Sequence, residues 1–350
     1  MRSYFEERTI STLERIRKIT DNLPYYVEEF FVGIENRTTP LTRLNYAYDL
    51  RIFFDFLSCK VFRGKKDALD ISIEDLDKLA ASDIELFLSY LSHYTINGKE
   101  ESCTERGKSR KLATIRSFFK FFFNKGVLTA NVAAKVAMPK LHDKEIVRLE
   151  SDGKINEIAA IINTADTGNG LSAKQQQFHK KTRIRDVAIL TLFLGTGIRI
   201  SELVGLNTED IDFNSNAFVV TRKGGNRTIL YFGDEVKAAL EEYLVERNGD
   251  DAVKNEPALF LSLRKKRIST KTVQDLVKKY AKIVSPLKKI TPHKLRSTFG
   301  TNLYRETGDI YVVADVLGHK DVNTTKKHYA AISDDIRKRA VKSVKLRDKE

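Results

Sequence analysis

TPHKLRSTFGTNLYRE, from Thr291 to Glu306, lies near the C-terminus and is soon followed by VLGHKDVNTTKKHYAAI, from Val316 to Ile332. The first stretch places His293 and Arg296 three residues apart, and side chains at that spacing share one face of a helix. The second stretch places His319 directly after a glycine. Imidazole and guanidinium groups that converge on one small target favour an anion, and a phosphate fits such donors well.

Three further residues extend this set. Arg199 lies in GTGIRISEL, where a Gly-bounded turn is predicted to enter a helix, and helix N-termini favour anions. The alternating segment AFVVTRKGGNRTILYF breaks at two glycines, which predicts a β-hairpin with Lys223 at its tip. Tyr329 follows in what we expect to be a helix. Two arginines, a lysine, two histidines and a tyrosine then form one candidate site.

The order and spacing of these blocks resemble the tyrosine recombinases of the phage integrase family. In that family the active site is made by an arginine in a G-x-R-x-S-E-L block, a hairpin lysine, an H-x-x-R pair, a histidine in L-G-H and a later tyrosine. The resemblance implies that all six catalytic positions are filled, by Arg199, Lys223, His293, Arg296, His319 and Tyr329.

The chemistry of a phosphodiester agrees with these residue types. Arg199 and Arg296 are expected to hold the phosphoryl oxygens, with His319 as a third donor. Tyr329 is the expected nucleophile that forms a 3′-phosphotyrosyl link, and Lys223 is the expected acid for the leaving 5′ oxygen. His293 can accept the proton of the tyrosine or position the phosphate, and both roles stay open. The mechanism requires no metal, nucleotide or other cofactor.

Composition points in the same direction. The chain has 350 residues and a formal net charge of +14, and a basic protein of this kind favours nucleic acid as its partner. Its two cysteines, Cys59 and Cys103, lack metal-ligand spacing and suit a reducing compartment. The sequence contains neither an apolar run of membrane-spanning length nor an N-terminal signal core, so we expect a cytoplasmic protein without a membrane partner.

The predicted architecture has two domains and is mainly α. Residues 1–142 show helical periodicity and are expected to form a helical bundle, which the resemblance identifies as a SAM-like core-binding domain that clamps DNA. Residues 143–350 are expected to form the α+β catalytic domain with a small antiparallel sheet and a C-terminal tail. Ser82 and Glu85 predict a capping box, and a later helix is predicted from Lys108 to Asn124.

Additional DNA contacts are predicted at basic residues. A cluster opens the helix that ends at Asn124, and others flank the hairpin lysine and the tyrosine. The bland alternative for each is a solvated surface charge. The residues are Lys108, Arg110, Lys111, Arg116, Arg222, Lys326 and Lys327.

Blocks such as LPYYVEEFF and VTRKGGNR are similar to Xer recombinases of the XerS type. That likeness implies chromosome dimer resolution at a dif-type site, through a Holliday junction, by a homotetramer on two DNA duplexes with a septal DNA translocase as partner. Ser297 departs from the histidine of those relatives. Tyr329 follows His319 by ten residues instead of nine, which mobile-element integrases tolerate.

Three alternatives therefore stay open. They are an integrase or excisionase of a mobile element, a catalytically silent DNA-binding protein, and a type IB topoisomerase. The tail after Ile332 is expected either to dock on a neighbouring subunit or to remain solvated.

Overall fold

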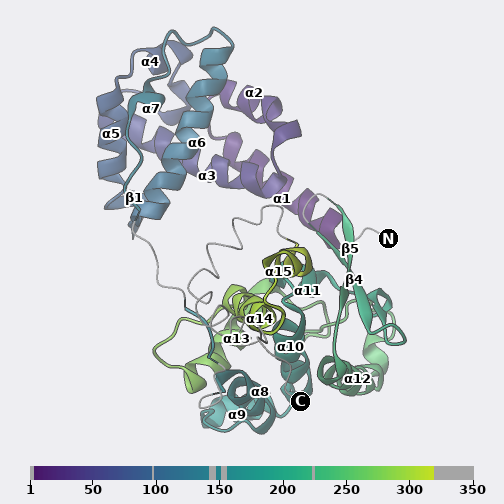
Figure 1. Cartoon of the computed structure of the whole chain (residues 1–350). Helices are drawn as coiled ribbons and strands as arrows, with labels where there is room; N and C mark the ends of the chain where they lie inside the picture. The colour runs from purple at the N-terminus through teal and green to yellow at the C-terminus, as the bar shows by residue number, and fades with distance from the viewer. Residues whose placement is uncertain (1–3, 97, 142–146, 151–155, 223–224, 319–350) are drawn as a thin grey trace, which may run out of the picture. The chain divides into compact units, whose positions relative to one another are not determined.

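The computed structural model describes residues 4–96, 98–141, 147–150, 156–222 and 225–318. The chain divides into two compact units, Met1–Lys144 and Glu145–Glu350, each considered by itself below. The predicted fold class is confirmed, because helices dominate and the described strands form small antiparallel sheets (Figure 1). No helix in these described ranges is both long and apolar enough to cross a bilayer.

The N-terminal unit is a bundle of helices with one short hairpin. Its elements are α1 (Tyr4–Thr20), α2 (Tyr26–Gly33), η1 (Glu35–Arg37), α3 (Pro40–Phe56), the π-helical turn η2 (Leu57–Val61), η3 (Ala68–Asp70), α4 (Ile73–Asp77), α5 (Ala81–Tyr90), β1 (Tyr94–Ile96), β2 (Lys99–Glu101), α6 (Glu105–Asn124) and α7 (Val132–Lys135).

Aromatic side chains form much of the core of this unit. Phe53 on α3, Phe87 on α5 and Phe118 on α6 are fully buried, and their rings meet neighbouring rings mostly edge to face. Such rings bury large apolar areas and prefer edge-to-face packing, so the helices that carry them are held at fixed angles. The phenylalanine-rich end of α6 is therefore largely core, although Phe123 remains 44% exposed.

Local details of this unit differ from the sequence-based prediction. The capping box at Ser82 and Glu85 is wrong, because α5 begins at Ala81 and the Asp83 carboxylate accepts the backbone N–H of Ala80 at 2.8 Å. The helix predicted to begin at Lys108 starts three residues earlier, after the N-cap Thr104, and ends at Asn124 as expected. The hairpin β1–β2 was not predicted at all.

The C-terminal unit contains helices and a three-stranded antiparallel sheet of order β3-β4-β5. Its elements are α8 (Glu157–Thr167), α9 (Ala173–His179), α10 (Arg183–Thr196), α11 (Ile200–Gly205), η4 (Thr208–Asp210), β3 (Ile211–Asp212), β4 (Ala217–Thr221), β5 (Arg227–Tyr231), α12 (Asp234–Asn248), η5 (Asp251–Val253), α13 (Thr270–Val284), α14 (Pro292–Thr307) and α15 (Ile310–Leu317).

Helix α10 is the central element of this unit. It packs against α8, α12 and α14 (Figure 1). Its side chains from Ala188 to Phe193 are mostly fully buried. A helix that is apolar on nearly every side is stable only when its neighbours cover it, which explains the central position. The C-terminal end of α10 is thereby fixed against α14, and the candidate site is built at this end.

The predicted hairpin is confirmed. Strands β4 and β5 pair antiparallel from Ala217↔Tyr231 to Thr221↔Arg227, and the backbone N–H of Arg222 donates to the carbonyl of Asn226 at 2.8 Å. Phe218, Val220 and Leu230 are buried, so one face of the sheet packs on the unit. The predicted tip lysine, Lys223, lies outside the described residues.

Candidate active site

Arg296 is one of the two arginines predicted to hold a phosphate. It lies in the second turn of α14 and is only 5% exposed. Its Nη1 donates to the carbonyl of Gly197, which follows α10, and its Nη2 donates to the carbonyl of Leu317, the last residue of α15. A guanidinium has five donors in a rigid plane, so these bonds fix its direction and join three helices at one point.

Arg199 reaches the same point from α11, whose N-cap it forms. Its Nη1 donates to Glu202 Oε1 at 2.8 Å, and its Nη2 donates to the carbonyls of Leu317 at 3.2 Å and Gly318 at 3.0 Å. The carbonyl of Leu317 therefore accepts from both arginines. Two guanidinium groups that share one acceptor lie close enough to bind one phosphate together.

Two glycines make this approach possible. Gly197 ends α10 with φ +63°, and a Cβ added there would lie 2.4 Å from the ring of Phe299 on α14. Gly318 ends α15 with φ +59°. Because L side chains rarely adopt positive φ, a glycine is the natural residue at both helix ends. The turn between α10 and α11 can then place Arg199 beside Arg296.

The remaining predicted catalytic residues divide into two groups. His293 lies in the first turn of α14, as predicted, and is exposed, whereas Arg296 on the same helix is buried. The structure therefore places them on one helix but in different surroundings. Lys223, His319 and Tyr329 lie outside the described residues, as do Lys326 and Lys327. Their roles stay predictions.

Comparison with known proteins identifies the family of the chain. The model of the phage integrase family matches residues 154–335, which is more than half of the chain. The chain belongs to the phage integrase family. Tyrosine recombinases of this family catalyse the cleavage and rejoining of DNA strands, so the protein is an enzyme of that class.

Curated relatives identify the type of tyrosine recombinase as Xer. The tyrosine recombinase XerC of Caldanaerobacter subterraneus subsp. tengcongensis is 36% identical over 314 residues, which cover 87% of this chain and 82% of the relative. The tyrosine recombinase XerS of Streptococcus mutans is 29% identical over 346 residues, covering 92% and 96%.

A solved structure shows the same fold. It is the XerH site-specific recombinase bound to a palindromic difH substrate in a post-cleavage complex, with a TM-score of 0.61 and 19% identity over 83% of this chain and 77% of that one.

Arg222 was predicted to contact DNA beside the hairpin lysine of this tyrosine recombinase. In the structure its guanidinium points toward the end of α15, where Nη2 makes a long 3.4 Å hydrogen bond to the carbonyl of Val316. Burial lowers the pKa of Arg222, and the nearby Arg199 acts in the same direction, whereas Glu202 and Asp315 oppose it. Arg222 is thus a third arginine that donates to a carbonyl at the end of α15, beside those that accept from Arg199 and Arg296.

The basic cluster at the start of α6 surrounds a carboxylate that sequence reasoning did not find. Asp49 on α3 is fully buried. Arg110 makes two hydrogen bonds to it, at 2.6 and 2.8 Å, and Lys111 lies 3.5 Å away with a side chain only 8% exposed. Thr114 donates to it at 2.9 Å. A buried carboxylate is stable only when paired and hydrogen-bonded, so this cluster joins α3 to α6.

The other two predicted DNA contacts of α6 also have protein partners. Lys108 pairs with Glu105 at 3.0 Å, and its side chain is 15% exposed. Arg116 donates through Nε to the carbonyl of Ala133 at 3.1 Å and through Nη2 to that of Val136. These bonds attach α6 to the segment that follows it. Contact of these basic residues with DNA stays a prediction.

Two buried acidic residues that orient the basic side chains were not predicted, although the sequence contains a pattern that indicates each of them. Glu202 follows Arg199 by three residues, a spacing that allows an ion pair on a helix, and it is 4% exposed. Asp49 is a lone acid within the largely apolar face of YAYDLRIFF. An acid on a buried face requires cationic partners, so the basic start of α6 was a candidate for this role.

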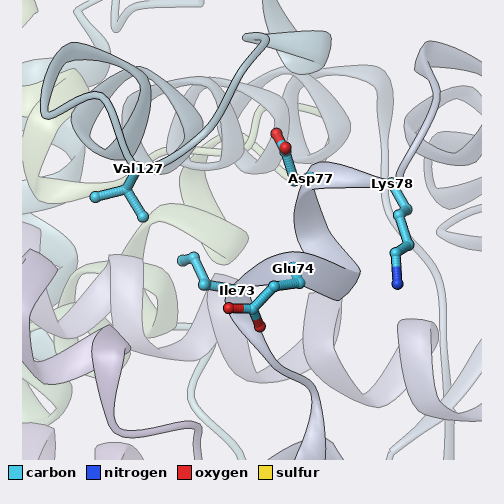
Figure 2. A pocket seen from close by; sticks show the side chains of 5 residues that line it. All are labelled: Ile73, Glu74, Asp77, Lys78 and Val127. Carbon is cyan, nitrogen blue, oxygen red and sulfur yellow. The ribbon is translucent and has the colours of Figure 1, made fainter.

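A surface pocket of about 220 Å³ lies in the N-terminal unit, and none of the predicted site residues lines it (Figure 2). Ile73, Glu74, Asp77 and Lys78 of the α4 region line it together with Val127. The carboxylate of Asp77 accepts the backbone N–H of Thr129 at 2.7 Å and its hydroxyl at 3.0 Å. The acid therefore connects α4 to the turn after α6.

Proposed function

We propose that the protein is a site-specific DNA recombinase that cuts and rejoins duplex DNA with Arg199, Lys223, His293, Arg296, His319 and Tyr329 as its catalytic residues. The observation that carries this proposal is the carbonyl of Leu317, which accepts hydrogen bonds from both Arg199 and Arg296. A scissile phosphate beside this carbonyl is within reach of both guanidinium groups. His319 follows the same helix end in the chain.

The reaction requires two coupled events at one phosphorus. The Tyr329 oxygen bonds to the phosphorus and gives up its proton, while the bond to the 5′ oxygen breaks and that oxygen takes a proton from Lys223. Arg199 and Arg296 stabilise the charge on the two non-bridging oxygens as it grows. His293 either accepts the phenol proton or positions the phosphate. The phosphotyrosyl bond retains the energy needed for rejoining.

The biological reaction that we propose is resolution of chromosome dimers at a dif-type site. The XerC and XerS relatives align over most of their length, and the XerH structure of the same fold holds a difH substrate. We further propose a homotetramer on two DNA duplexes, exchange through a Holliday junction and a septal DNA translocase as partner.

The alternative is an integrase of a mobile element, a class that tolerates the ten-residue interval between His319 and Tyr329. A two-site recombination assay with dif-type and element-end substrates distinguishes these reactions. Relaxation of a plasmid that lacks any specific site would instead indicate a type IB topoisomerase.

Tyr329→Phe tests the chemistry directly. On a nicked suicide duplex, the wild-type protein is expected to accumulate a covalent protein–DNA adduct, because the fragment beyond the nick diffuses away. The Phe variant is expected to bind the duplex with unchanged Kd and to trap no adduct. An adduct formed by Tyr329→Phe would exclude this residue as the nucleophile, and Tyr304→Phe and Tyr311→Phe are the matched controls.

A further inference from the structure

The guanidinium of Arg222 lies directly against Gly318, in the space that a Cβ at that position would take. A Cβ added to Gly318 would lie 1.6 Å from Arg222 Nη1 and 2.2 Å from its Cζ. Nη2 of the same guanidinium donates to the carbonyl of Val316. The end of β4 and the end of α15 are therefore joined by one arginine packed on one glycine, although they are far apart in the sequence.

The position of the Arg222 side chain lowers the stability of the fold. The Nε of Arg222 is buried, and it finds no acceptor among the residues that the structure describes. A buried donor without an acceptor destabilises a fold, so stability alone would favour a different side chain. Arg199 also lies near enough to affect Arg222 electrostatically. Unsatisfied donors and like charges held together are typical of sites whose geometry serves function.

The three arginines donate to the carbonyls of three consecutive residues at the end of α15. Arg222 contacts the carbonyl of Val316, Arg296 that of Leu317, and Arg199 those of Leu317 and Gly318. Arg222 directly precedes Lys223 in the chain, and Gly318 directly precedes His319. The contact between Arg222 and Gly318 thus joins the two backbone segments from which the proposed acid and the proposed third phosphate donor continue.

We propose that Arg222 is a positioning residue that fastens the hairpin to the end of α15, so that Lys223 is directed to the phosphate that Arg199 and Arg296 bind. Gly318 is its partner, because a Cβ at that position would displace the guanidinium from its present place. This inference rests on the proposed function. It differs from the sequence-based prediction, in which Arg222 contacts the DNA backbone.

A change of leaving group distinguishes a positioning role of Arg222 from a contact of Arg222 with the DNA backbone. The substrates are a suicide duplex with an ordinary scissile phosphate and the same duplex with sulfur in place of the leaving 5′ oxygen. A thiolate leaves without a proton, so loss of general acid catalysis slows only the ordinary substrate. Arg222→Ala is expected to slow single-turnover cleavage of that substrate by about 10²-fold, the lower limit for general acid catalysis. The sulfur substrate should be cleaved within about fivefold of the wild-type rate, because its leaving group needs no acid.

Matched variants complete the test. Lys223→Ala should show the same pattern of rescue, and Arg222→Lys should recover only part of the rate because it lacks the planar group. Arg227→Ala removes a charge from the exposed strand of the same hairpin and measures the effect of charge loss alone on Kd. Equal losses for Arg222→Ala on both substrates, or a loss in Kd matching Arg227→Ala with no change in rate, would overturn the positioning role.

Gly318→Ala tests the contact without removing a charge. It should slow cleavage of the ordinary substrate, and the loss should be clearly smaller when Arg222→Ala is already present, because the clash is gone and only the cost of positive φ remains. If the rate losses of Gly318→Ala and Arg222→Ala are additive in the double variant, the proposed contact between the two residues is wrong. If Lys223→Ala is not rescued by sulfur, the acid assignment fails, and the role of Arg222 fails with it. Failure of Arg222→Ala alone leaves the proposed function intact.

Discussion

The two units of this molecule use clustered cations in opposite ways. In the N-terminal unit, Arg110 and Lys111 surround the buried carboxylate of Asp49, whose charge opposes theirs. In the C-terminal unit, Arg199 and Arg296 meet at the carbonyl of Leu317. A carbonyl accepts a hydrogen bond without carrying a charge, so these bonds orient the guanidinium groups without adding an opposite charge, although Glu202 also pairs with Arg199. Both clusters join helices, but the arginines of the C-terminal unit do so at an uncharged carbonyl, which suits them to binding phosphate as well.

Removing the carboxylate should have the largest effect on stability. Asp49→Asn keeps the shape of the side chain but leaves Lys111 buried without its counter-charge, and breaking a buried pair costs about 3–5 kcal/mol. Hydrogen exchange of the α3 and α6 amides in the full-length protein measures this loss for the N-terminal unit. Glu29→Gln, which breaks the exposed pair with Lys125, should cost less than about 1 kcal/mol. Equal losses of stability in Asp49→Asn and Glu29→Gln would show that the buried Asp49 cluster stabilises the bundle no more than an exposed ion pair does.

Replacing a proposed phosphate ligand should instead affect chemistry. Arg296→Lys loses the planar fork, and removal of one such donor slows the chemical step by about 10²–10³-fold. The rate of adduct formation on the suicide duplex at saturating protein measures this effect. The same substitution at Arg110 should appear mainly in hydrogen exchange of α3 and α6, since its partner is Asp49. A loss of cleavage in Arg110→Lys as large as that in Arg296→Lys would contradict the difference between the units.

A partly exposed ion pair in the C-terminal unit should have the smallest effect. Burial raises the pKa of Glu157, but hydrogen bonds from Lys288, Ser285 and the backbone of Glu150 outweigh it and hold this pKa below its ordinary value. A lowered pKa in the folded state stabilises the protein above the unfolded value of about 4.5, and this stability is lost as the pH falls through the folded pKa.

Glu157→Gln should therefore destabilise the unit by about 1 kcal/mol at pH 7 and by progressively less below pH ~4.5. Thermal unfolding of both proteins at pH 7, 5 and 3.5 measures the difference. Asp275→Asn, which breaks the exposed pair with Lys271, is the control and should change stability by less than about 0.5 kcal/mol. A difference for Glu157→Gln that is the same at all three pH values would exclude the carboxylate as its source.

Parts of the fold followed from local patterns and parts did not. The hairpin of β4 and β5 and the end of α6 at Asn124 were predictable, because glycines interrupt an alternating or helical pattern there. The start of α5 was not, since Ser82 and Asp83 are both good capping residues, and in the structure it is the Asp83 carboxylate that accepts the N–H of Ala80. The pair β1–β2 is too short for its periodicity to stand out, and neither strand is strongly apolar.

The sequence by itself determined the family and the chemical types in the site, because the order Arg, Lys, His-x-x-Arg, Gly-His, Tyr is carried by residue identity and spacing. Only the tertiary structure decided which acceptor each cation reaches. A long cationic side chain can reach several groups around its own helix. Packing between distant segments directs Arg110 to Asp49, Arg222 to the end of α15, and Arg199 and Arg296 to one carbonyl. Those partners come from segments distant in the chain, and periodicity within one segment contains no information about them.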